Sequence, residues 1–102
     1  MEFLVNIKLN WSKDMDPDHI EKVTVEERAH AAELAAKGHL VRMWRVPCRF
    51  ENWGIWQAQD ATELHEIIAH MPAHPWMYDI VVLPLAKHPV DPSSPPTITR
   101  KN

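Results

Sequence analysis

The sequence is short of glycine, of cysteine and of positive charge. Its 102 residues include two glycines, one cysteine and 11 lysines and arginines against 14 aspartates and glutamates. Two glycines give no glycine-rich phosphate-binding loop, and a single cysteine, Cys48, cannot form an internal disulfide. A net charge of -3 without a basic run disfavours nucleic-acid binding. The cysteine usage is typical of a protein in a reducing cytoplasm.

Long apolar runs are also missing. The longest, Ile80 to Ala86, contains Pro84 and is far too short to cross a bilayer. The N-terminal residues alternate polar with apolar, unlike a signal peptide. We therefore expect one soluble domain over residues 1–88. Residues 89–102 are rich in proline and lack periodicity, which predicts an extended tail that is disordered or lies over a neighbour.

Tryptophan, in contrast, is abundant, with five residues in so short a chain. One small core cannot bury them all, so some should line a pocket or a subunit interface. They are Trp11, Trp44, Trp53, Trp56 and Trp76.

Hydrophobic periodicity predicts four strands, at residues 2–10, 40–48, 53–59 and 79–85. In the second strand, Leu40, Trp44 and Val46 should share one face, with Val41, Met43 and Arg45 on the other.

Two helices are expected between these strands. The first should run over 17–37, capped by Asp16 and stopped by Gly38. The second should follow Asp60, with Glu63 completing a capping box, and end near Met71.

The element order β-α-β-β-α-β predicts an α+β, ferredoxin-like fold, a four-stranded antiparallel sheet with two helices on one face. Because both faces of the strands carry apolar residues, the uncovered face should bury against another copy of the chain.

The first helix carries an acid on its apolar stripe. Glu27 lies four residues after Val23 and four before Ala31, on the face that should be buried. Burial raises a carboxyl pKa, as a base working near neutral pH requires. Alternatively, Glu27 lies at the stripe's edge and reaches water or an arginine. The pattern alone favours this second interpretation.

Other polar residues admit both a functional and a structural interpretation. His65 and His70 are five residues apart, too far around a helix to share a metal, so a metal site is disfavoured. His65 is either a proton donor or a surface histidine. Arg42, Arg45 and Arg49 either lie on a solvated strand edge, form an ion pair between subunits, or bind a carboxylate or a lactone carbonyl. Arg45 is the foremost candidate for binding, because it stands between Trp44 and Val46. Asn52 could donate its amide to an oxyanion.

Several motifs together resemble the muconolactone delta-isomerase family, over residues 1 to about 90. The motifs are Asp14-Met15-Asp16-Pro17, Glu26-Glu27, Met43-Trp44-Arg45-Val46, Asn52, Glu63-Leu64-His65-Glu66, Met71-Pro72 and Leu83-Pro84-Leu85-Ala86-Lys87-His88-Pro89. The resemblance implies an isomerase that needs no cofactor or metal. Such an enzyme shifts the ring double bond of muconolactone to give 3-oxoadipate enol-lactone in catechol breakdown, and assembles as a homo-oligomer of dimers, typically a decamer.

The resemblance also implies roles for individual residues. Glu27 becomes the base, which reverses the preference drawn from the helical pattern. Asn52 and His65 would bind the developing negative oxygen or relay a proton. Arg45 and Lys22 would hold the substrate carboxylate. The remaining expected substrate contacts come from Trp44, Trp53, His74 and Trp76.

One loop departs from the family pattern. His74 and Trp76 replace an apolar ring and a phenol, and Tyr78 resembles an insertion. Two alternatives therefore stay open. In the first, the chain is a chloromuconolactone dehalogenase that uses the same base and releases HCl. In the second, it is a non-catalytic oligomer that binds a lactone or an aromatic compound.

Overall fold

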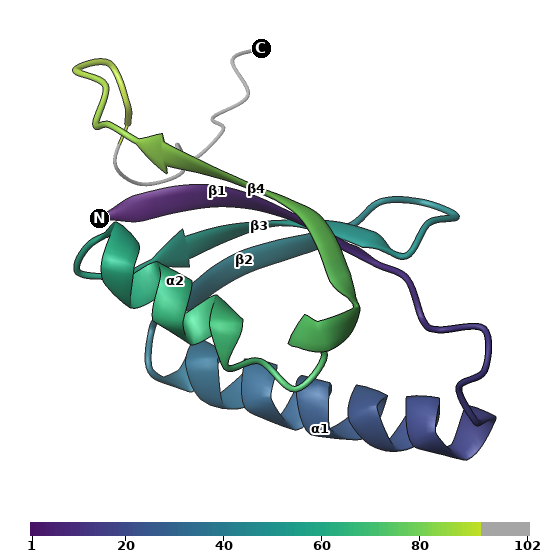
Figure 1. Cartoon of the computed structure of the whole chain (residues 1–102). Coiled ribbons are helices and arrows are strands. Elements are labelled where there is room, and N and C mark those ends of the chain that lie inside the picture. The colour runs from purple at the N-terminus through teal and green to yellow at the C-terminus, as the bar shows by residue number, and fades with distance from the viewer. Residues whose placement is uncertain (93–102) are drawn as a thin grey trace, which may run out of the picture.

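The computed structural model describes residues 1–92 and contains four strands and two α-helices (Figure 1). In chain order they are β1 (Glu2–Leu9), α1 (Pro17–Ala36), β2 (Leu40–Arg45), β3 (Glu51–Gln57), α2 (Ala61–Ala69) and β4 (Met77–Leu85), with a short 3-10 helix at His74–Trp76 before β4. Most of the predicted tail, from residue 93 onward, lies outside the described residues.

The strands form one antiparallel sheet in the order β2-β3-β1-β4, and both helices lie on the same face of it (Figure 1). The predicted ferredoxin-like α+β fold is confirmed. The core lies between helices and sheet, where alternate residues of β1 and β3 meet α2. Its most buried side chains include Phe3, Val5, Ile7, Trp56, Leu64 and Ile68.

The ends of α1 follow the predicted capping chemistry. The Asp16 carboxylate accepts a hydrogen bond from the Asp18 amide at 2.9 Å, and Pro17 opens the helix. At the other end Gly38 adopts a φ of 86°, and the His39 amide donates to the Leu34 carbonyl at 2.9 Å. These caps fix which turns of α1 lie over the sheet.

Helix α2 differs slightly from its prediction. Asp60 accepts from the Glu63 amide at 2.8 Å, as a cap should. The Glu63 carboxylate accepts from the Gln59 amide at 2.9 Å, one residue before the position of a standard capping box. The helix ends at Ala69, two residues earlier than expected.

The predicted face assignment within β2 is wrong at its start. Leu40 pairs with Trp56 and Arg42 with Ile55, so the partner strand advances by one residue while β2 advances by two. This β-bulge places Leu40 on the helix-facing side together with Arg45, rather than with Trp44. Alternating patterns cannot reveal such a bulge, because one extra residue reverses every later side chain.

Strand boundaries also shift where pairing extends or stops. Strand β2 ends at Arg45, not near Cys48, because the following residues form a turn in which Cys48 has a φ of 63°. Strand β3 begins at Glu51 rather than Trp53, because Glu51 pairs with Lys8 of β1.

A second bulge lies in β4. Lys8 pairs with Tyr78 and Asn6 with Val81, so β4 carries one residue more than β1 between these pairs. Asp79 adopts a φ of 45° there, and the Lys8 ammonium donates to its carbonyl at 3.1 Å. The bulge accommodates an extra residue in the segment where Tyr78 departs from the family pattern.

Among the described residues, neither α-helix combines the length and the apolar composition that crossing a bilayer demands.

Candidate active site

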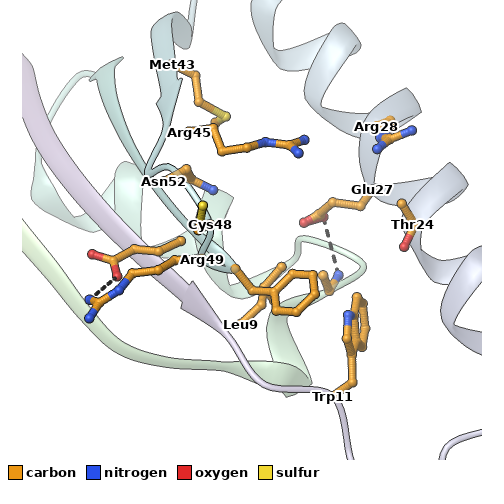
Figure 2. A pocket seen from close by; sticks show the side chains of 13 residues that line it. Leu9, Trp11, Thr24, Glu27, Arg28, Met43, Arg45, Cys48, Arg49 and Asn52 are labelled. Carbon is orange, nitrogen blue, oxygen red and sulfur yellow. Dashed lines mark hydrogen bonds and ion pairs between the residues drawn. The ribbon is translucent and has the colours of Figure 1, made fainter.

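A cavity of about 570 Å³ opens between α1 and one end of the sheet (Figure 2). Helix α1 contributes Thr24, Glu27 and Arg28, and the loop after α2 contributes Ala73. The other lining residues are Leu9, Trp11, Met43, Arg45, Cys48, Arg49, Phe50, Glu51 and Asn52. One helix, several strands and three loops therefore converge on one space large enough for a small organic molecule.

The strand register explains why Arg45 and Asn52 reach this cavity. Arg45 of β2 pairs with Asn52 of β3, which in turn pairs with Ile7 of β1. Paired residues of antiparallel strands project to the same face of a sheet. Because Ile7 is part of the core beneath the helices, Arg45 and Asn52 also face α1.

Glu27 lies on the stripe of α1 that contains the buried residues Val23 and Leu34, and its carboxyl group is half-buried. Its Oε1 accepts a hydrogen bond from the Ala73 amide at 3.3 Å (Figure 2). Burial raises the pKa of the Glu27 carboxyl above its ordinary value, although the Ala73 amide, His30 and His74 oppose this shift. A carboxylate in this environment is a stronger base than one in water.

The charges around Glu27 are predominantly positive. Arg49 is paired with Glu51, at 3.5 Å between Nη1 and Oε1. Neither Arg28 nor Arg45 forms an ion pair within residues 1–92. Figure 2 shows the Arg45 side chain extending from β2 toward α1, where Arg28 follows Glu27. Two unpaired guanidinium groups at a cavity favour an anionic ligand.

Asn52 of β3 adds a polar group to the same cavity. Figure 2 shows its amide nitrogen turned toward the cavity. Its Oδ1 is buried and has no hydrogen-bond partner among the described residues. A buried polar side chain that is only partly satisfied is uncommon away from functional sites. The amide nitrogen of Asn52 is therefore placed to donate a hydrogen bond to a bound oxygen, whereas its unpaired Oδ1 can only accept one.

Of the predicted site residues, the structure brings Glu27, Arg45 and Asn52 together in this cavity. His65 and His74 line a different cavity, of about 390 Å³, between α2 and β4. His74 is nevertheless near enough to act electrostatically on Glu27. Lys22 is exposed on α1 and lines neither cavity.

The three predicted tryptophans lie elsewhere. Trp44 and Trp53 pair with each other on the sheet face opposite the helices, one residue out of phase with Arg45 and Asn52. Trp76 packs against Trp11 instead of lining the cavity itself, with 5.3 Å between ring centroids. Trp76 therefore contacts a residue of the cavity wall, Trp11, rather than the cavity.

Sequence reasoning missed several lining residues. Arg28 could have been suspected from its position next to Glu27, and Trp11 from its place between the first strand and the first helix. Cys48 and Phe50 carry no signal, because the shape of their turn decides where they point. No group of three or more potential metal ligands occurs within the described part of the chain.

Comparisons with known proteins point to one family. The sequence model of the muconolactone delta-isomerase family matches residues 1–91. A muconolactone delta-isomerase of Rhodococcus opacus is 33% identical over 89 residues, which cover 87% of this chain and 95% of the relative. Another, of Cupriavidus pinatubonensis, is also 33% identical, with 87% and 96% covered.

Solved structures show the same fold. A crystal structure of muconolactone isomerase superimposes with a TM-score of 0.83 at 27% identity, covering 93% of this chain and 98% of that one. The 5-chloro-2-hydroxyhydroquinone dehydrochlorinase of Burkholderia phenoliruptrix, solved with 2,5-dihydroxybenzoquinone, gives a TM-score of 0.59 at 16% identity, covering 86% and 96%. At that identity the second likeness concerns the fold alone.

Proposed function

The chain belongs to the muconolactone delta-isomerase family, and from this premise we propose that it converts muconolactone to 3-oxoadipate enol-lactone by glutamate-mediated proton transfer. The observation that carries the proposal is Glu27, a half-buried carboxylate of raised pKa, in a cavity that is also lined by two arginines without ion pairs among the described residues. A base and a site for an anion are the two parts that this reaction requires.

The proposed reaction moves one proton. The Glu27 carboxylate removes the hydrogen from the ring carbon that bears the carboxymethyl arm. The electrons of that C–H bond form a new ring double bond, and charge spreads through the former double bond onto the carbonyl oxygen of the lactone. A proton then returns two carbons away, next to the carbonyl. No atom is gained or lost, and Glu27 ends ionised as it began.

Two groups would assist this transfer. The Asn52 amide would donate a hydrogen bond to the carbonyl oxygen of the lactone as that oxygen becomes negative. In the cavity, less water competes for this oxygen. Arg45 would bind the carboxylate arm, and Arg28 stands in place of Lys22 as the second cation at the cavity. His65 takes no part in this scheme, because it lines the other cavity.

The outer face of the sheet supports the further proposal that the protein is a homo-oligomer of dimers. Trp44 is 45% exposed, and β4 adds Val81, Leu83 and Leu85 at 39%, 47% and 40%. By the strand register these four side chains project away from the helices. Exposed apolar side chains at both edges of one sheet face are typical of a subunit interface.

The test of the function is proton exchange in heavy water. Purified protein is incubated with muconolactone in D₂O, and ¹H NMR follows both the substrate and its products. We expect loss of the signal at the carbon bearing the arm and appearance of the enol-lactone. Exchange without product would still locate a base, whereas neither exchange nor product would refute the proposal.

Parallel assays separate the two alternatives. With a chlorinated lactone, release of chloride at a rate above isomerisation of muconolactone would identify a dehalogenase. Calorimetric binding of a lactone that is neither exchanged nor converted would identify a non-catalytic binding protein.

A further inference from the structure

The turn that follows α2 provides the only hydrogen bond to the Glu27 side chain among residues 1–92. The donor is the amide of Ala73, 3.3 Å from Oε1. Ala73 is 1% exposed, so water does not replace this donor easily. The orientation of the carboxylate therefore depends on where the turn places one peptide group.

Residue 76 anchors this turn on the opposite side. The Trp76 indole packs against Trp11 at 5.3 Å, with 49° between the ring planes, and His19 meets it edge-on at 5.9 Å. Its carbonyl accepts from the Asn10 amide at 2.9 Å. Ring and backbone thus attach Trp76 to the segment that joins β1 to α1.

The path from Trp76 back to Ala73 is short and stiff. The two residues belong to a single 3-10 turn, in which the Trp76 amide donates to the Ala73 carbonyl at 3.0 Å. The His74 amide donates to the Met71 carbonyl at 2.9 Å. A displacement of the Trp76 ring should therefore displace the Ala73 amide as well.

From these contacts we propose that Trp76 is a positioning residue, which together with Trp11 holds the 73–76 turn so that the Ala73 amide orients the Glu27 carboxylate for proton transfer. The inference rests on the proposed function and deepens it. It gives Trp76 a role other than the substrate contact that the sequence suggested, in keeping with its place behind Trp11.

Other charged groups also surround Glu27. Arg28 and His30 lie on α1, Arg45 on β2 and His74 on the turn. A pH profile of the Trp76 variants must therefore be compared with the wild type over the same range, so that the histidine contribution is common to both.

The experiment compares Trp76→Ala with Trp76→Phe. A displacement of about 1 Å in a catalytic group can cost up to about 10²-fold in rate. We expect Trp76→Ala to lower kcat about tenfold or more with KM within about threefold of the wild type, and Trp76→Phe, which keeps a ring on Trp11, to restore most of the loss. Val25→Ala, at an exposed position on α1, is the matched control and should behave as wild type.

A second readout does not require turnover. The hydrogen bond from the Ala73 amide favours the ionised form of the Glu27 carboxylate. Loss of this hydrogen bond should therefore move the titration of Glu27 to higher pH. ¹³C NMR of glutamate-labelled protein follows this titration, and Glu27→Gln identifies the signal. Replacing the peptide bond at residue 73 by an ester, which removes only the N–H, should cause a shift in the same direction.

The outcomes are distinct. An unchanged Glu27 titration in both Trp76→Ala and the ester variant would overturn the positioning role, whether or not the lactone is converted. Wild-type kcat in Trp76→Ala would overturn it as well. Absence of lactone turnover in the wild type, with the titration shift intact, would instead refute the proposed function and leave the positioning of Glu27 standing. Should Trp76→Ala fail to fold, Trp76→Leu, which keeps an apolar side chain but no ring against Trp11, replaces it in both measurements.

Discussion

Polar side chains on the two faces of the sheet differ in whether they have hydrogen-bond or ion-pair partners. On the outer face Asn6 is only 2% exposed, and its amide donates to the Glu51 carboxylate at 3.0 Å and to the Asn52 carbonyl at 3.1 Å, while Lys8 donates to the Asn6 side chain. On the helix-facing side, the Asn52 Oδ1 has no partner within residues 1–92, and Arg45 has no ion pair there.

This difference separates structure from function within a few residues. Polar groups that satisfy one another stabilise a fold, because each would otherwise remain buried without a partner. Polar groups that converge on a cavity without partners are available to a ligand. Asn52 and Trp53 are neighbours in sequence, yet only the first faces the cavity.

The largest effect should come from the helix-facing side. Glu27→Gln keeps the size of the side chain but removes its basicity, and a missing general base typically costs 10²–10⁴-fold, so we expect turnover to fall by about 10²-fold or more. Steady-state kinetics with muconolactone measure the change, and circular dichroism verifies the fold. Val25→Ala on the same helix serves as control. Activity near the wild-type level in Glu27→Gln would remove Glu27 from the mechanism.

A pair of arginines on β2 compares the two faces directly. Arg45 faces the cavity, whereas the Arg42 guanidinium lies 4.9 Å from the Trp44 ring centroid on the outer face. A charge-assisted hydrogen bond is worth roughly 1.5–3 kcal/mol, so Arg45→Leu should raise KM for muconolactone about tenfold or more. Arg42→Leu should leave KM unchanged, provided that light scattering shows the variant to assemble to the same mass as the wild type. Equal effects of the two substitutions would mean that the side chain's face does not determine its role.

The sequence predicted the fold well because its signals are local. Alternation gives strands, and Asp16, Gly38 and Asp60 mark helix ends through their own hydrogen bonds and φ angles. Helical spacing also placed Glu27 on the buried stripe. Burial and the Ala73 hydrogen bond, which the spacing does not contain, decide between the two interpretations of that placement.

The prediction of the cavity walls was weaker because they depend on contacts between distant segments. The bulge after Leu40 determines which residues of β2 face the helices, and only the pairing with β3 reveals it. The 73–76 turn reaches Glu27 across 46 residues of sequence. Trp76 was therefore expected beside the substrate, although it packs behind Trp11.

A substitution on the outer face of the sheet should change the oligomeric state rather than the rate of the reaction. Leu83→Asp places a charge among exposed apolar side chains of β4, where an interface with another copy would have to bury it unpaired. We expect the mass measured by light scattering at micromolar concentration to fall to that of a smaller assembly or a monomer. Thr24→Ser, a substitution on α1 away from the outer face of the sheet, should leave the mass unchanged. A wild-type chain that is itself monomeric would contradict the proposed oligomer.

The smallest expected effect is on stability. The substitution that should abolish most of the activity, Glu27→Gln, should stabilise the fold at neutral pH. Burial raises the pKa of Glu27, so the native state binds this proton more tightly than the unfolded chain does. The resulting stability is complete below the unfolded pKa and is lost as pH rises through the native one, where folding must keep an ionised carboxylate half-buried. Glu27→Gln avoids this loss. Its Tm should match the wild type in acid and exceed it by a few degrees at neutral pH, as measured by calorimetry from pH 4 to 8. A wild type that is the more stable at neutral pH would mean that the Ala73 amide and the surrounding cations outweigh burial, and that Glu27 is held ionised as a structural ion rather than kept ready to accept a proton.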